Sequence, residues 1–214
     1  MAPCYGTIIS SGDEQAHVIH YASPEVHALL GNEKVFHNMP HQKLLEGLQA
    51  DFDAPEAKAF ASEELGITEE VFYKRLNHLK KYAMMAYCTV LQGTLPAGVA
   101  LLPFLAANGS LVTCRLIFGA RRTHEGEMSC LTTLEDISQD MAVVDLMNMA
   151  STGDYFIYMR DEKAKVRTEN FQQHLATLCD QAEASAVEPA TLRPSVVRRV
   201  GHSSLTSGEE EAAR

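Results

Sequence analysis

Histidine spacing is the feature of this chain that most directly suggests chemistry. Five of the nine histidines fall within the first 41 residues, and His17 and His20 are separated by three positions. On a helix this spacing would bring two imidazoles to one face, where they could bind zinc, but the surrounding residues have the pattern of a strand, which sends them to opposite faces. A second pair, His37 and His41, is interrupted by Pro40, which disrupts a helix. We keep His17 and His20 as candidate metal ligands but expect the chain to hold no metal and no cofactor.

A second candidate site is the polar segment 121–127, which lies between two segments with strand-like alternation. Its residues Arg121, Arg122, His124 and Glu125 supply guanidinium, imidazole and carboxylate groups, which can bind an anion or perform acid–base chemistry. The solvated tip of a β-hairpin has the same composition and is the simpler interpretation. These four residues are therefore candidate catalytic residues only if the fold brings one of the early histidines next to them.

The sequence contains no motif for nucleophilic catalysis or phosphate binding: no G-x-S-x-G, no Walker A sequence and no G-x-G-x-x-G. Its five cysteines are dispersed and form no C-x-x-C pair, which is typical of free thiols in a reducing compartment. Cys114 and Cys130 could approach each other across a hairpin, where two packed thiols are a simpler interpretation than a redox pair, and Cys88 is expected to be buried. Because the N-terminus resembles no signal peptide and no apolar run is long enough to span a membrane, we expect a cytoplasmic protein.

The net charge of −10 restricts the class of partner. A nucleic-acid-binding protein needs clustered lysine and arginine, so this charge argues against nucleic acid, and it also argues against an anionic membrane surface. The negative charge is concentrated in residues 44–70, which contain eight carboxylates against a single lysine. We expect this segment to bind a cationic surface of another protein. Its partner-binding residues are predicted to be Glu63, Glu64, Glu69 and Glu70.

The clearest periodicity predicts a helix that begins after Thr68 and ends near Gly93. Thr68 can cap the first turn, and Glu69 and Glu70 follow where the helix dipole favours carboxylates. An apolar stripe with helical spacing indicates one buried face, formed by Phe72, Leu76, Leu79, Ala83, Tyr87 and Val90. Nucleic acid stays an alternative partner only through the basic residues of this helix, Lys74, Arg75, Lys80 and Lys81.

In the N-terminal half, residues 5–10 and 16–21 are predicted strands and residues 24–30 a short helix. A second short helix is expected at 42–48. The acidic stretch after it, which includes Pro55, is expected to form a loop with one helical turn.

In the C-terminal half, the alternation across residues 111–118 and 128–134 predicts a β-hairpin. Thr133 with Asp136 resembles a capping box that opens a helix, while residues 141–149 fit either a helix or a strand. Further strands are expected at 155–159 and 164–167, and a terminal helix at 171–182.

Together these elements predict an α+β fold in which an antiparallel sheet from the C-terminal half packs against two or three helices. Periodicity stops after residue 184, so we expect one globular domain over residues 1–184 and a disordered tail over 185–214. The sequence favours a non-enzymatic accessory or regulatory protein that binds another protein, for example an inhibitor of a plasmid, phage or immunity system. A small cytoplasmic enzyme is the alternative, with a site assembled from the 121–127 loop and the N-terminal histidines.

Overall fold

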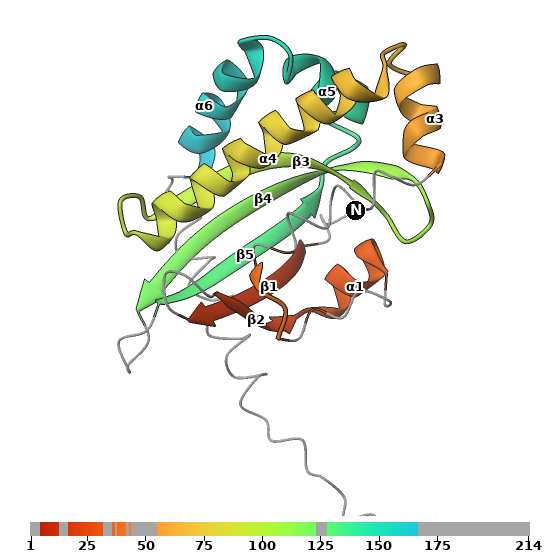
Figure 1. Cartoon of the computed structure of the whole chain (residues 1–214). Helices are drawn as coiled ribbons and strands as arrows, with labels where there is room; N and C mark the ends of the chain where they lie inside the picture. The colour runs from red at the N-terminus through yellow and green to blue at the C-terminus, as the bar shows by residue number, and fades with distance from the viewer. Residues whose placement is uncertain are drawn as a thin grey trace, which may run out of the picture.

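The computed structural model describes residues 5–12, 17–31, 36, 38–41, 43, 55–122 and 128–166 (Figure 1). Five strands form one antiparallel sheet in the order β2-β1-β5-β4-β3: β1 (Tyr5–Gly12), β2 (Val18–Ala22), β3 (Ala97–Leu105), β4 (Leu111–Arg122) and β5 (Met128–Asp136). The described helices are α1 (Pro24–Leu30), α3 (Pro55–Glu63), α4 (Glu69–Leu91), α5 (Val143–Met149) and α6 (Asp154–Val166). The predicted α+β class, with an antiparallel sheet packed against helices, is confirmed.

The sheet contains the predicted C-terminal strands and, in addition, the two N-terminal strands β1 and β2, which the prediction did not include. The strands predicted at 5–10 and 16–21 are confirmed, and β1 extends to Gly12. β1 lies between β2 and β5, because Ser10 pairs with Ile19 on one side and with Cys130 on the other. Pairing between segments so far apart in the chain follows from tertiary packing, for which the sequence of either strand carries no local signal.

The helix predicted after Thr68 is confirmed as α4, which lies over β3 and β4 (Figure 1). Thr68 Oγ1 accepts a hydrogen bond of 3.4 Å from the Val71 amide, which satisfies one free donor of the first turn. All six residues of the predicted apolar stripe are buried. The helix ends at Leu91 with Gln92 as its C-cap residue, and Gly93 follows with a φ of +69°, a conformation that glycine adopts without strain.

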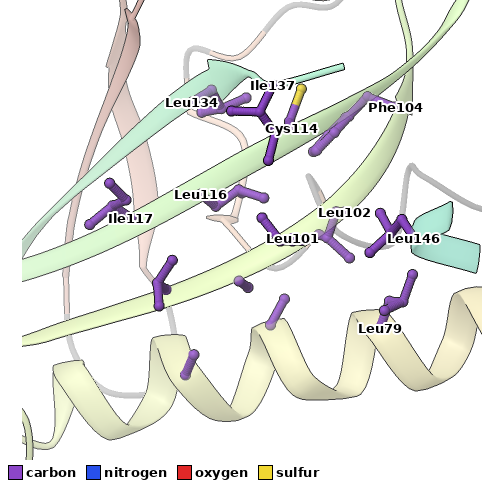
Figure 2. Close-up of a cluster of buried hydrophobic side chains, with 14 of the residues drawn as sticks. Leu79, Leu101, Leu102, Phe104, Cys114, Leu116, Ile117, Leu134, Ile137 and Leu146 are labelled. Carbon is purple, nitrogen blue, oxygen red and sulfur yellow. The ribbon is translucent and has the colours of Figure 1, made fainter. Parts of the chain in front are cut away.

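The hydrophobic core lies between α4 and the sheet. Leu79 of α4, Leu102 of β3 and Leu146 of α5 converge there, and each is fully buried (Figure 2). α4 approaches β3 so closely that a Cβ atom on Gly98 would lie 2.9 Å from the Ala86 carbonyl oxygen. Only glycine fits at this point of contact.

The apolar segment around Pro103 forms β3, the strand at one edge of the sheet. A proline is tolerated in an edge strand because the missing amide need not take part in the ladder. The hydroxyl of Tyr155, on α6, lies 3.5 Å from both the amide nitrogen and the carbonyl oxygen of Leu101. α6 therefore covers part of an edge that would otherwise be open to pairing with another chain.

The strands predicted at 155–159 and 164–167 are wrong, because residues 154–166 form helix α6. The buried side chains are Tyr155, Met159 and Glu162, which follow a helical spacing of four and three. Ile157, which a strand would bury beside Tyr155, is 56% exposed. Aromatic and β-branched residues favour strands locally, but packing against α4 and β3 decides the outcome.

Three smaller predictions are corrected or decided by the structure. Residues 143–149 form the helix α5, so the strand alternative is wrong. The capping box is also wrong, because Asp136 ends β5 and its carboxylate accepts hydrogen bonds from the Ser138 amide and hydroxyl, at 2.9 and 2.6 Å. The single helical turn expected near Pro55 is the nine-residue helix α3. The helices predicted at 42–48 and 171–182 and the tail at 185–214 lie outside the described residues, apart from Lys43.

Candidate functional site

The four predicted partner-binding carboxylates lie at the junction of two helices and are all exposed. Glu63 is the last residue of α3 and Glu64 follows it, while Glu69 and Glu70 begin α4. The connection between the helices turns at Gly66, whose φ is +62°. Lys58 forms an ion pair of 3.7 Å with Glu69. We call these four carboxylates the acidic surface.

The two candidate metal ligands are in different environments. His17 is buried, whereas His20 is exposed on β2, and its Nε2 shares a hydrogen bond of 2.6 Å with Ser11 Oγ. The pairing of β1 with β2 is irregular between Ile9 and Ser10, and His20 lies in this bulge, between Ile19 and Tyr21. Among the described residues, no group of three or more histidine, cysteine or carboxylate side chains could hold a metal ion.

The strand register brings part of the predicted catalytic segment towards this Ser11–His20 pair. Ser11 is opposite Ser129 on β5, and Ser129 is opposite Arg121 on β4. Arg122 is likewise opposite Met128, the first residue of β5. Directly opposed residues share one face of a sheet, so positions 11, 129 and 121 form a row across three strands. His124 and Glu125 lie outside the described residues.

A buried polar cluster that was not predicted from the sequence lies between α4 and the sheet. Its members are Ser10 of β1, Tyr87 of α4, Thr132 of β5 and His41, and all four are buried. The His41 ring stacks on Tyr87, with centroids 4.3 Å apart and planes 5° apart. Its Nε2 shares a hydrogen bond of 3.1 Å with Thr132 Oγ1. The backbone around His41 is held against β2, since the Ile19 amide donates to the Met39 carbonyl oxygen at 2.8 Å and the His41 amide donates to the His17 carbonyl oxygen, just before β2, at 2.7 Å.

The environment of this cluster disfavours charge. Burial, with a smaller contribution from neighbouring His17, lowers the pKa of His41 from 6.5 to about 3, so its imidazole is neutral near pH 7. Burial also raises the pKa of the Tyr87 phenol, as does Cys130, while the nearby Ser10 hydroxyl opposes the rise. The cluster can therefore donate and accept hydrogen bonds but carries no charge at neutral pH. Tyr87 was the only member assigned to the core from the sequence; a serine and a threonine at otherwise apolar strand positions were the available signal.

A second polar group lies where α6 meets the sheet. Arg115 of β4 forms ion pairs of 3.0 Å with Glu135 of β5 and 2.9 Å with Glu162 of α6. Burial raises the pKa of the Glu135 carboxyl above its usual range, although Arg115 opposes the change. Only 3% of the Glu162 side chain is exposed. Arg115 therefore offsets part of the negative charge of two carboxylates and connects α6 to two strands, which is a structural role.

The cysteines do not form the arrangement considered from the sequence. Cys114 is opposite Asp136 and Cys130 is opposite Ala120, so the hairpin register separates them. Both are buried free thiols, and burial raises the pKa of Cys114. Cys88 is exposed, so its predicted burial is wrong. It lies beside Tyr87 on α4 but one position off the buried stripe.

Comparison with protein-family models and with curated proteins found no match to this chain. Among the described residues, no helix has both the length and the apolar character needed to cross a membrane. Any assignment of function therefore depends on the surfaces and side chains described above.

Proposed function

We propose that this protein is a non-enzymatic regulator that acts by binding another protein through the acidic surface. The observation that supports this proposal is the exposure of all four carboxylates, Glu63, Glu64, Glu69 and Glu70, at one helix junction. Lys58 is the single cation within the segment 44–70, and it forms an ion pair with Glu69 alone among these four in the described structure. A net charge of −10 adds a long-range attraction for a cationic partner surface.

The acidic surface is suited to binding because its side chains contribute little to the core. Exposed carboxylates stabilise a fold weakly, so four of them in adjoining turns are free to serve a partner. Glu69 and Glu70 also favour the start of α4 through the helix dipole, which explains part of their presence without any partner. Glu63 and Glu64 lie at the end of α3, where the helix dipole disfavours carboxylates. Their presence is therefore stronger support for partner binding than that of Glu69 and Glu70.

As part of the same proposal, we place the protein in the cytoplasm. Cys88, Cys114 and Cys130 are free thiols, and Cys88 is exposed. A reducing compartment preserves such thiols. The class of partner is a protein with a lysine- or arginine-rich surface, as in an inhibitor that occupies a site meant for a polyanion.

The test is co-purification from native lysate with the double variant Glu63→Lys and Glu64→Lys. These substitutions remove acidic charge and add cations at a helix C-terminus, where the dipole accepts them, so the fold is expected to persist. We expect the wild-type chain to retain a stoichiometric protein partner that is released at high salt, and the variant to retain less than a tenth of it.

The matched control is Asp140→Lys with Asp161→Lys, which changes the net charge equally at exposed positions outside α3, α4 and the connection between them. It should keep the partner. Equal loss in both double variants would indicate a general charge effect, and unchanged binding in the first variant would contradict the proposal.

The alternative is a small enzyme whose site combines an N-terminal histidine with the 121–127 segment. The hydrogen bond between Ser11 Oγ and His20 Nε2 favours it, because a nucleophile and its base must lie within such a distance. In an acyl transfer, Ser11 Oγ would attack an ester carbonyl carbon while His20 accepts the hydroxyl proton. His20 would then return that proton to the leaving alcohol, and water would hydrolyse the acyl-Ser11 ester.

This alternative predicts hydrolysis of an activated ester such as p-nitrophenyl acetate, which Ser11→Ala and His20→Gln would each reduce at least tenfold. Thr7→Val, on the same strand away from His20, is the control. If the wild-type protein and all variants hydrolyse the ester only at the rate of free imidazole, the enzymatic alternative is excluded.

A further inference from the structure

The buried polar cluster contains more hydrogen-bonding groups than the described part of the chain satisfies. Three of its atoms, Ser10 Oγ, His41 Nδ1 and Tyr87 Oη, are buried and have no hydrogen-bond partner within the described part of the chain. The Ser10 hydroxyl lies close enough to the Tyr87 hydroxyl to lower its pKa in the manner of a hydrogen bond, but the two groups do not meet the distance and angle of a well-formed hydrogen bond. Buried polar atoms in native proteins are normally satisfied, so three in one place require an explanation.

These three atoms belong to neighbouring side chains, because Tyr87 is next to both Ser10 and His41. Ser10 projects from β1 on the face of the sheet that α4 covers, Tyr87 reaches it from α4, and the His41 ring stacks on Tyr87. Ser10 and His41 are each 0% exposed and Tyr87 is 4% exposed. The three unsatisfied atoms therefore belong to one cluster and are not isolated cases in different parts of the core.

The chemistry of the location limits what it can hold. His41 is neutral at pH 7, and the Tyr87 phenol keeps its proton. Neither side chain would offer an ion an opposite charge, and the ion would lose its hydration. A neutral molecule that both donates and accepts hydrogen bonds would satisfy two hydroxyls and an imidazole nitrogen together.

We propose that Ser10, His41 and Tyr87 form an internal binding site for a small neutral molecule with both hydrogen-bond donor and acceptor groups. Water is the smallest member of this class, and a small polar organic solute is the other source of the same chemistry. The site is separate from the acidic surface and does not depend on the proposed partner binding.

The direction in which the melting temperature changes when the cluster's hydroxyls are removed tests this site. If the hydroxyls are unsatisfied, their removal by Ser10→Ala or Tyr87→Phe relieves a desolvation cost and leaves the melting temperature equal or higher. If they hold a molecule, each substitution breaks a hydrogen bond, and we expect the melting temperature to fall by roughly 3 °C or more. Thr113→Val is the matched control, because Thr113 Oγ1 is also buried without a partner but lies outside the cluster. It should cause no such fall.

Two direct measurements on the wild-type protein complete the test, because a Ser10–Tyr87 hydrogen bond in solution would also make both substitutions destabilising. A high-resolution crystal structure should show non-protein density within hydrogen-bond distance of the three atoms. Mass spectrometry of the supernatant after denaturation then identifies an organic molecule or, by finding none, assigns the density to water. An unchanged or raised melting temperature in both variants, or no density at the three atoms, would overturn the proposal.

Discussion

His41 shows how a single buried side chain links sequence to pH dependence. It enters the core from a segment fixed to β2, stacks on Tyr87 and shares a hydrogen bond with Thr132. These contacts suit a neutral imidazole, and burial together with nearby His17 opposes protonation. The segment around His41 is therefore bound to the sheet by interactions that acid weakens.

We predict that stability falls as the pH decreases from about 6.5 towards 3. The pKa of His41 is lowered from 6.5 to about 3 in the folded protein. Between these values the unfolded chain binds a proton that the folded protein excludes, so the free energy of unfolding decreases by at most ~1.4 kcal/mol per pH unit. Above pH 6.5 both states are neutral at His41, and this contribution no longer changes with pH.

Urea denaturation at pH 7.5 and pH 5 measures the effect, with His41→Gln as the comparison. The glutamine variant is less stable at pH 7.5, but its loss of stability between the two pH values should be smaller by roughly 2 kcal/mol. An equal loss in wild type and variant would show that His41 does not exclude the proton.

At the scale of elements, the close contact between α4 and β3 depends on the absence of a side chain at Gly98. The Cβ of an alanine at position 98 would lie 2.9 Å from the Ala86 carbonyl oxygen and 3.0 Å from Val90 Cγ2. The first of these is backbone and cannot rotate away, so the helix would have to move off the strand. The long apolar stripe of α4 makes such a movement costly.

We predict that Gly98→Ala lowers the free energy of unfolding by ~1–3 kcal/mol, the usual cost of overfilling a packed contact. Gly153→Ala is the control, because no atom lies within 4 Å of its Cβ position and its φ is not in the left-handed region. It should change stability by less than ~0.5 kcal/mol. Urea denaturation of both variants provides the comparison. Equal stabilities would mean that α4 can shift away from β3 without a loss of folding free energy.

α6 shows where local sequence and tertiary packing disagree. The run Tyr155 to Met159 is rich in residues that favour strands, yet it is helical. Its buried positions contact α4 through Tyr82 and reach β3 through the Tyr155 hydroxyl, and Glu162 is paired with Arg115. Only a helical spacing makes all of these contacts together.

At the scale of the whole molecule, the sheet order brings together residues that are far apart in the chain. Because β1 is inserted beside β5, Ser11 lies in a row with Ser129 and position 121, and Ser10 comes to face Tyr87. The row of positions 11, 129 and 121 in the alternative proposal and the location of Ser10 in the proposed internal site both depend on this pairing. The acidic surface, in contrast, depends only on two consecutive helices.

The sequence by itself determined the features that depend on neighbouring residues. The Thr68 cap, the apolar stripe of α4, the 111–134 hairpin and the exposed carboxylates at the α3–α4 junction all follow from local spacing and charge. Tertiary structure decided the insertion of β1, the helical state of α6 and the cluster around His41. Each of these depends on contacts between distant segments, and their free energy outweighs local propensity.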